Sequence, residues 1–316
     1  MRVLVTGGAG FIGSNLVRHL AGMANPPEVS VIDDLSTGSL DNLHGCCVEF
    51  VKGSILDSAL LQRAVDGIDV IVHLAALASV PRSLANPMAS HEANATGTLS
   101  VLEAARCAAV HQVIVASSSS VYGANPHMPK VEDDWTRPLS PYAVSKLATE
   151  GYALAYQASF GLPVLAFRFF NVYGPRQSPN HAYAAVIPKF LDAGLRGDVA
   201  EITGDGRQSR DFTYVGSVCA VIGEAIQRQV SSPTPVNLAF GTRLTLLELL
   251  ELIESVLGRK MARRFVPERM GDVRESSAST SRLMSLFPGT HAVEIREGLI
   301  ETANWLQGQL RSEDRG

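Results

Sequence analysis

The sequence predicts an α/β protein with a doubly wound parallel sheet and a second, smaller mixed α/β domain. Short apolar runs rich in β-branched residues alternate with helical segments through the first half of the chain. The first of these runs ends in a glycine-rich turn that opens a helix. After Phe170 the chain changes to short elements between turn-forming residues, which indicates a separate domain.

Composition limits the class of protein. A chain of 316 residues is long for one core, so two lobes are expected. Hydrophobic residues make up 46% and the net charge is −4, which favours a soluble protein and argues against nucleic acid or an anionic membrane as partner. No apolar run approaches the roughly 20 residues of a membrane span. The chain enters its first strand without a charged and apolar leader, so we expect a cytoplasmic location.

The cysteines show no spacing typical of metal ligands, and two of them are adjacent, which disfavours a disulfide between them. We therefore expect reduced thiols and no metal site. The four residues are Cys46, Cys47, Cys107 and Cys219.

The first βαβ unit predicts a dinucleotide site. Arg2 to Thr6 forms the strand, and residues 15–20 continue as a helix whose N-terminus faces an anion. Between them, glycines allow a tight turn and close backbone approach to a diphosphate. The predicted contacts in this turn are Gly7, Gly10, Phe11, Ile12 and Gly13. The alternative is a plain turn.

The second strand, Glu28 to Ile32, ends in Asp33 and Asp34. An acidic residue about 20 positions after the glycines holds the two ribose hydroxyls and repels a 2′-phosphate. Asp33 therefore favours NAD over NADP. The alternative is an aspartate that only caps a turn.

The strands that follow bring small side chains to the same edge of the sheet. We expect strands at residues 47–52, 70–76 and 162–169, and a helix from Asn94 to Ala108. Ligands of such sheets bind at the carboxyl ends of the strands. His73 follows an apolar run, and a structural role is favoured over a catalytic one.

A tyrosine and a lysine carry the predicted chemistry. The apolar run 113–116 predicts a buried strand that leads into four serines, and Pro141 opens a helix. Tyr142 and Lys146 share a face of that helix about one turn apart. An ammonium near a phenol lowers the pKa of the phenol, which would make Tyr142 a general base or acid. The alternative is an amphipathic surface pair.

The second half predicts helices at residues 184–196, 218–227 and 246–257, and strands at 200–203 and 236–239, the last rejoining the sheet. The tail after Gln307 is polar and is expected to fray. We assign residues 1–170 and 212–242 to a cofactor domain, 171–211 and 243–310 to a substrate domain, and 311–316 to the tail.

These motifs together resemble the extended short-chain dehydrogenase/reductase family, and especially its nucleotide-sugar 4-epimerases. The resemblance covers nearly the whole chain. It is carried by the residue runs 6–13, 117–123, 168–175 and 210–212 and by the Tyr-x-x-x-Lys pair. It implies a Rossmann domain with tightly bound NAD.

The resemblance also implies roles for single residues. Tyr142 would take the proton of the sugar 4-hydroxyl, Lys146 would support Tyr142 and bind the nicotinamide ribose, and Ser118 would hold the same sugar oxygen, with Ser119 and Ser120 as alternatives. Oxidation at C4 would give a 4-keto sugar that turns its other face and is reduced again. Further cofactor contacts implied are Ser54, Ile55, Leu74, Ala75, Ala76, Asn94 and Phe169. Ser54 stands where the family often has an aspartate, so its hydrogen bond to adenine would be weaker.

The neighbours of Ser118 discriminate between reactions of the family. The 4,6-dehydratases and the UDP-glucuronate decarboxylases carry carboxylates just after the catalytic residue. Here those positions are Ser119 and Ser120, which disfavours both reactions. Retention of Tyr142 and Lys146 likewise disfavours a non-catalytic NAD(H)-binding regulator. A net oxidoreductase that releases NADH remains a third alternative.

The substrate end is implied in the same way. Asn171, Arg210, Arg269 and Asp272 match family positions that bind the nucleotide diphosphate and its ribose, and a guanidinium suits a diphosphate. Small or polar residues at sugar-facing positions leave room for a 2-acetamido group, which favours UDP-GlcNAc/UDP-GalNAc over UDP-Glc/UDP-Gal and leaves a uronic acid open. They are Ala78, Ser119, Gln177, Ala185 and Ser276. Val186 is implied as a further substrate contact, in the run 183–189 that resembles the UDP-N-acetylglucosamine 4-epimerases. The resemblance further implies a homodimer through residues 94–108 and 141–160.

Overall fold

The computed structural model describes residues 1–180, 184–267 and 274–313. Seven parallel strands form the main sheet in the order β11-β6-β5-β4-β1-β2-β3. They are β1 (Arg2–Thr6), β2 (Glu28–Asp33), β3 (Glu49–Lys52), β4 (Val70–His73), β5 (Gln112–Ser118), β6 (Val164–Phe169) and β11 (Val236–Leu238). The order reverses between β1 and β4, and at such a point a doubly wound sheet binds its ligand. The predicted fold class is confirmed.

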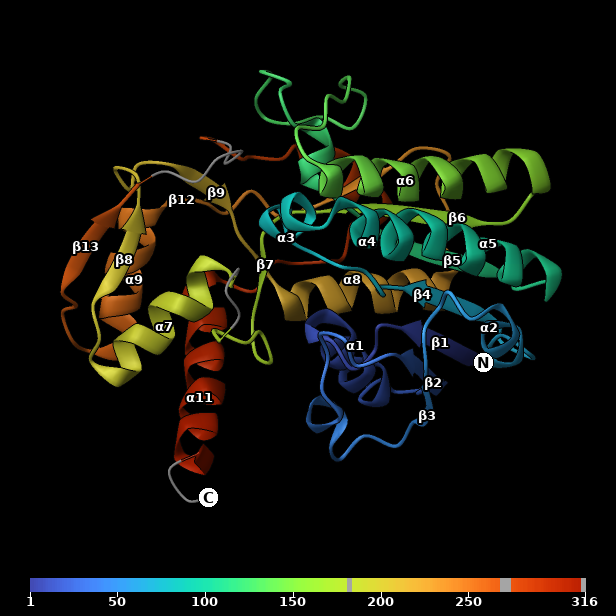
Figure 1. Cartoon of the computed structure of the whole chain (residues 1–316), viewed down its shortest axis with the longest axis horizontal. Coiled ribbons are helices and arrows are strands. Elements are labelled where there is room, and N and C mark those ends of the chain that lie inside the picture. Colours follow the sequence, from blue (N-terminus) through green and yellow to red (C-terminus); the bar gives the residue numbers. More distant parts are fainter. Residues whose placement is uncertain (181–183, 268–273, 314–316) are drawn as a thin grey trace.

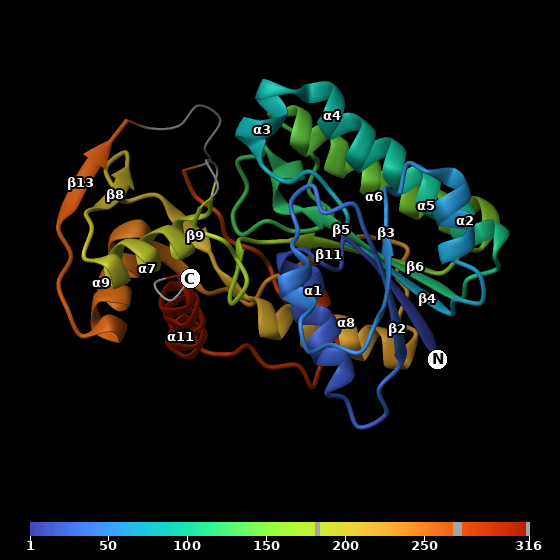
Figure 2. The same ribbon diagram turned by 60° about the horizontal axis from the view of Figure 1, so that its bottom comes forward.

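Helices cover both faces of this sheet (Figures 1 and 2). Successive side chains of a strand point to opposite faces. Val3 and Val5 accordingly join the core with α1 (Phe11–Ala21) and α8 (Val215–Arg228), whereas Leu4 joins a second core with α2 (Ser58–Ala64), α5 (Gly97–Cys107) and α6 (Pro141–Phe160). The predicted strand at residues 236–239 does join the sheet, beside β6.

The second part of the chain lies to the left in Figure 1 and consists of short strands and helices. β8 (Ala200–Thr203) pairs with β13 (Arg263–Val266), and β9 (Ser209–Asp211) pairs with β12 (Arg243–Thr245). The helices here are α7 (Val186–Arg196), α9 (Leu246–Leu257) and α11 (Ile295–Glu313). β7 (Val172–Tyr173) and β10 (Thr213–Tyr214) form a third pair. The domain bounds stay a prediction, but α10 (Ser281–Leu286) returns from the second part to pack on β11.

Two segments differ from the sequence prediction. The predicted helix at residues 94–108 is preceded by α3 (Val80–Ala85), α4 (Pro87–His91) and a π turn at residues 92–96, because Ser79 and Asn86 cap two proline-started helices. The tail does not fray after Gln307. α11 continues to Glu313 because its earlier turns bury an apolar face that includes Leu299 and Leu306.

Candidate active site

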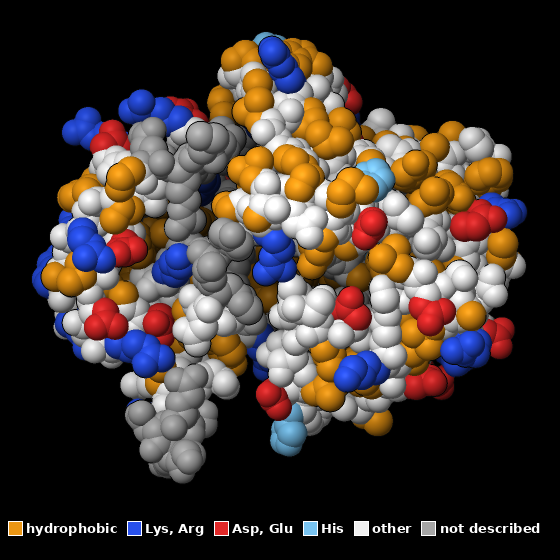
Figure 3. Space-filling view, in the orientation of Figure 1, with side chains coloured by type: hydrophobic (Ala, Val, Ile, Leu, Met, Phe, Trp, Pro, Cys, Tyr) orange, Lys and Arg blue, Asp and Glu red, His pale blue; other side chains and the backbone are white. Residues whose placement is uncertain are grey.

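A cavity of about 1200 Å³ lies where the carboxyl ends of the main strands meet the second part of the chain. Figure 3 shows the surface hollowed between these two parts. Most of the predicted site residues line this cavity. They are Gly7, Gly10, Phe11, Ile12, Gly13, Asp33, Ser54, Ile55, Leu74, Ala75, Ala76, Ala78, Ser118, Ser119, Tyr142, Lys146, Phe169, Asn171, Gln177, Ala185, Arg210 and Ser276.

The glycine turn is shaped for close backbone approach. Gly7 has a φ of 70°, and a Cβ there would lie 2.7 Å from the backbone of Ala75. A Cβ at Gly13 would lie 2.3 Å from the carbonyl oxygen of Gly7. Helix α1 begins at Phe11, and Gly10 supplies no side-chain cap. The first N–H groups of α1 therefore meet the cavity without a capping side chain, which suits a diphosphate.

Asp33 is held at the end of β2 by the glycine turn itself. Its Oδ2 accepts a hydrogen bond from the Ala9 N–H at 2.9 Å, and its Oδ1 accepts one from the Leu35 N–H at 2.8 Å. Burial raises the pKa of the Asp33 carboxyl, and these two backbone bonds oppose that rise. The result is a fixed carboxylate on the cavity wall about 20 residues after the glycines, as a ribose diol requires.

The predicted catalytic residues meet on one wall. Ser140 caps α6 by accepting from the Ala143 N–H at 3.1 Å, and this fixes Tyr142 in the first turn. The Tyr142 phenol lies near the Ser118 hydroxyl, at the carboxyl end of β5, and Ser118 acts to lower the pKa of the phenol. One turn further along α6, the Lys146 ammonium donates to the Ala116 carbonyl at 2.8 Å. A hydroxyl, a phenol and an ammonium thus line the same part of the cavity.

The predicted lowering of the Tyr142 pKa by Lys146 is wrong for this structure. Burial raises the pKa of the Tyr142 phenol, and Ser118 opposes the rise only in part. Burial also lowers the pKa of the Lys146 ammonium to about 8. The physical reason is that both groups lose hydration, while the Lys146 ammonium donates to the Ala116 carbonyl and not to the phenol. At neutral pH the phenol keeps its proton and Lys146 is mostly charged.

A second layer of buried polar residues supports this wall. His73 lies between Thr6 and Thr98, with Nδ1–Oγ1 and Nε2–Oγ1 distances of 2.8 and 3.0 Å. Burial and the charge of Lys146 lower its pKa to about 3, so it is neutral, and its predicted structural role is confirmed.

Asn94 was predicted to contact the cofactor, but it lies behind the cavity wall and is 1% exposed. Its Oδ1 accepts from the Leu77 N–H at 2.7 Å, and its Nδ2 donates to Ser145 Oγ at 2.9 Å. Since Leu77 lines the cavity, Asn94 ties that wall to α6.

The second part of the chain supplies the opposite wall. Asn171 has a φ of 30° and donates from Nδ2 to the Asp211 carbonyl at 2.9 Å. Gln177 donates from Nε2 to the Val172 carbonyl at 3.1 Å, while its Oε1 has no partner among the described residues. Arg210 lines the cavity from β9. Arg269 and Asp272 lie outside the described residues, and Val186, the first residue of α7, is not on the wall.

Sequence reasoning missed four cations of the cavity wall, which are Arg82, Lys130, Arg176 and Arg196. Arg176 donates from Nη1 to Asn15 Oδ1 at 3.1 Å and so joins the second part to α1. The sequence carries a signal for Arg176, because this residue directly follows the family motif at residues 168–175. Lys130 stands in a loop that gives no local signal, because a lone lysine outside any motif is typical of a solvated surface.

The described residues contain no group of His, Cys, Asp and Glu side chains suited to hold a metal ion. The four cysteines are unpaired in the structure. Within the described ranges, no helix is both long and apolar enough to cross a bilayer.

Comparison with known proteins shows where this site belongs. The model of the NAD dependent epimerase/dehydratase family matches residues 3–239. The chain is 37% identical to the UDP-glucose 4-epimerase of Mycolicibacterium smegmatis over 98% of this chain and 99% of that protein. This chain is a member of the NAD dependent epimerase/dehydratase family.

Solved structures of relatives agree with that membership. The UDP-N-acetylglucosamine 4-epimerase of Methanobrevibacter ruminantium, in complex with UDP-N-acetylmuramic acid, is 38% identical over 98% of both chains with a TM-score of 0.91. The UDP-glucose 4-epimerase of Thermus thermophilus, in complex with NAD, is 36% identical over 98% of this chain and 99% of that one, with a TM-score of 0.88.

The residues present in this member of the family fit NAD. The glycine turn leaves space that any Cβ at Gly7 or Gly13 would fill, and the N-terminus of α1 opens onto it. Asp33 is positioned for the ribose hydroxyls, next to the turn that would hold the diphosphate. Gly7, Gly13 and Asp33 would therefore hold the cofactor, and Lys146 would lie near its nicotinamide end.

Proposed function

We propose that this protein is an isomerase that interconverts UDP-sugars epimeric at C4. The observation that supports this most strongly is that Ser118, Tyr142 and Lys146 line one cavity with the glycine turn and Asp33. When bound, NAD⁺ would supply a hydride acceptor and donor, which is the chemistry that a reversible oxidation at C4 needs. No net oxidation results, so the protein would not accumulate NADH.

Three side chains would move and hold the proton. The neutral phenol of Tyr142 is a good donor to the oxygen of a 4-keto sugar, and its conjugate base would take the proton from the 4-hydroxyl in the reverse direction. Ser118, which lies near the Tyr142 phenol on the same cavity wall, would orient that sugar oxygen. The Lys146 charge would stabilise the phenolate whenever it forms, which offsets the cost of ionising a buried tyrosine.

The residues next to Ser118 favour epimerisation over the eliminations of the family. Ser120 donates from its Oγ to Ser118 Oγ at 2.9 Å and from its N–H to the same atom at 3.2 Å. The two positions after Ser118, Ser119 and Ser120, open the turn from Ser119 to Tyr122 (the serine turn) and both carry hydroxyls. Neither serine can act as the carboxylate base that a 4,6-dehydration would need.

Sugar choice is the finer part of the proposal. Ala78, Ser119, Ala185 and Ser276 are small residues on the cavity wall, and space of this kind admits a 2-acetamido group. We therefore favour UDP-GlcNAc/UDP-GalNAc, with UDP-Glc/UDP-Gal as a side activity. Arg210 and Asn171 would bind the UDP part. The test is turnover with a panel of UDP-sugars, in which a mixture of UDP-GlcNAc and UDP-GalNAc forms from either one. Steady formation of NADH would instead indicate a net oxidoreductase, and bound NAD without turnover would indicate a regulator.

The assembly proposed is a homodimer in the cytoplasm. Helices α5 and α6 lie side by side, and α6 presents Val144, Tyr152 and Phe160 to solvent with exposed fractions of 54%, 40% and 57%. A second copy of this face would bury these side chains.

A further inference from the structure

Lys130 brings an ammonium to the cavity wall beside the serine turn. Its side chain is nearly buried, and the residue lines the cavity. Nζ donates to the carbonyl of Asn125 and lies 6.0 Å from the centroid of the Tyr122 ring. Tyr122 ends the turn that begins at Ser119, directly after Ser118. Lys130 thus belongs to the wall on which the proposed catalytic serine lies.

The backbone of Lys130 is tied to the other sugar-facing segment. Its N–H donates to the Ser277 carbonyl at 2.8 Å, and its carbonyl accepts from the Ser279 N–H at 2.8 Å. Ser276, the residue before this pairing, lines the cavity. The lysine is therefore held between the serine turn and Ser276, which is the stretch that the proposed function assigns to the hexose.

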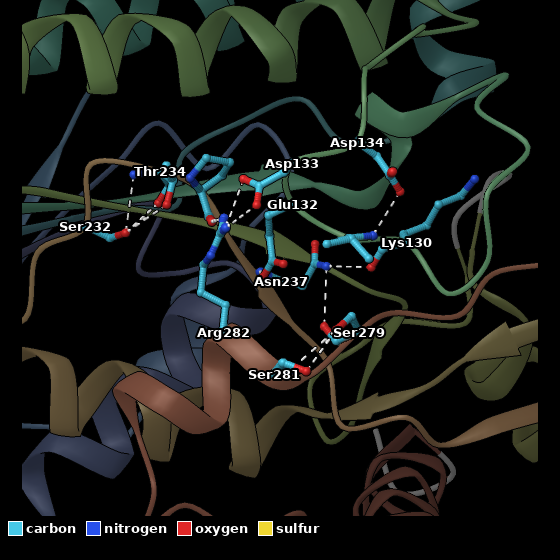
Figure 4. Close-up of polar contacts among 12 residues, drawn as sticks. Lys130, Glu132, Asp133, Asp134, Ser232, Thr234, Asn237, Ser279, Ser281 and Arg282 are labelled. Carbon is cyan, nitrogen blue, oxygen red and sulfur yellow. Dashed lines mark hydrogen bonds and ion pairs between the residues drawn. The ribbon is translucent and has the colours of Figure 1, made fainter.

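The charge of Lys130 has no carboxylate partner within ion-pair distance among the described residues. Figure 4 shows its side chain directed away from Glu132 and Arg282. Glu132 instead accepts from the Asn237 N–H at 2.9 Å, and Arg282 pairs with Asp133 at 2.9 Å. Of the three donors of an ammonium, one goes to Asn125.

The nearest acidic groups are likewise committed elsewhere. Glu275, which also lines the cavity, pairs with Arg243 at 2.9 Å. Asp134 acts on Lys130 only at a distance and is bonded to the Val131 N–H and His127. A nearly buried ammonium in this state gains more from an anion in the cavity than an exposed lysine would, because its hydration is already reduced.

We propose that Lys130 selects nucleotide sugars whose hexose carries a carboxylate, such as hexuronates. This rests on the proposed 4-epimerase activity and adds a preference to it: of two UDP-sugars with the same substituent at C2, the one that carries a carboxylate would bind more tightly. The carboxylate would supply the partner that the protein does not. The selection is compatible with room for a 2-acetamido group, since the two substituents occupy different carbons of the ring.

Calorimetric binding to the NAD-loaded protein tests this without any turnover. The measured quantity is the ratio of the dissociation constants of UDP-glucuronate and UDP-glucose. Because both ligands contain UDP, the contribution of UDP to binding cancels in this ratio. We expect wild type to favour UDP-glucuronate, Lys130→Met to shift the ratio about tenfold against it, and Lys130→Arg to restore it. Lys260→Met, which removes an exposed lysine outside the cavity, should keep the wild-type ratio.

An unchanged ratio in Lys130→Met, or equal weakening of both ligands, would overturn the assignment. Should that variant fail to fold, wild type alone decides: added salt should reduce the preference for UDP-glucuronate, and a preference that is absent or independent of salt overturns the assignment. Turnover of neutral UDP-sugars tests the proposed epimerase separately. Normal turnover of neutral UDP-sugars together with no binding preference for UDP-glucuronate would overturn the role of Lys130 and leave the proposed epimerase activity intact.

Discussion

The Lys146 ammonium lies 2.8 Å from the Ala116 carbonyl oxygen, one helical turn beyond Tyr142 on α6. The charge is thus anchored to the end of β5, the strand that also carries Ser118. This arrangement holds a buried ammonium on the same cavity wall as the phenol. Its hydrogen bond goes to the carbonyl, so the phenol hydroxyl stays available to the substrate. Catalysis would then depend on Lys146 staying charged.

Activity should therefore fall at alkaline pH. Burial lowers the pKa of Lys146 to about 8, so the charge that stabilises the Tyr142 phenolate is lost as pH rises through that value. The same shift has the opposite sign for stability. The folded state disfavours the charged lysine, so this group's unfavourable contribution is full below pH 8 and fades above it. The check is a profile of kcat against pH beside thermal unfolding over the same range. A flat profile between pH 7 and 10 would contradict the role of Lys146.

Asp211 should make the fold less stable as pH rises from about 4 to 6. It is fully buried, and burial raises its pKa to about 6. The Ala278 N–H donates to Oδ2 at 3.1 Å, while Oδ1 has no partner among the described residues. When a carboxyl has a higher pKa in the folded state than in the unfolded state, its stabilising contribution is full below the unfolded-state pKa. That contribution is lost as pH rises through the folded-state pKa, and the free energy of unfolding falls by at most about 3 kcal/mol. Urea midpoints across this range, compared with Asp211→Asn, measure the slope. Identical slopes in both proteins would refute the assignment.

Loss of Glu150 should destabilise the protein strongly. Its carboxylate accepts from Arg168 Nε at 2.9 Å and Nη2 at 2.7 Å, with both side chains about 5% exposed or less. Glu150→Gln leaves the buried Arg168 guanidinium without its counter-charge, which lowers the free energy of unfolding by about 3–5 kcal/mol. Glu103→Gln is the matched control, because Glu103 forms a comparable pair with Arg106 at the surface. Denaturant unfolding should show a much smaller loss for the control, and similar losses would argue against this account.

Gly151→Glu should separate the proposed dimer. A side chain at Gly151 would meet open space within the monomer, on the exposed face of α6. The substitution should improve helix propensity, by roughly 0.5–1 kcal/mol, while placing a charge in the proposed interface. Gly308→Glu on α11 has the same open surroundings and serves as the control. Sedimentation should show monomers for the first variant and dimers for the second. Dimers in both would rule out the α5/α6 face.

Most of the fold and the best-defined motifs of the site follow from local sequence pattern. The glycine turn, Asp33, the serine turn and the Tyr142–Lys146 pair each have short spacings that fix their chemistry. Contacts between distant segments have no such signal. The placement of Lys130 depends on pairing with Ser277 and Ser279, almost 150 residues away. The sign of the Tyr142 pKa shift depends on burial, which spacing along a helix does not report.

The most direct test of the account is the turnover of Tyr142→Phe, which removes one oxygen and keeps the ring. The variant should retain NAD and the wild-type melting temperature, while kcat with the best UDP-sugar falls by about 10²–10⁴. A variant that retains full turnover would contradict the central claim that the Tyr142 phenol carries the proton.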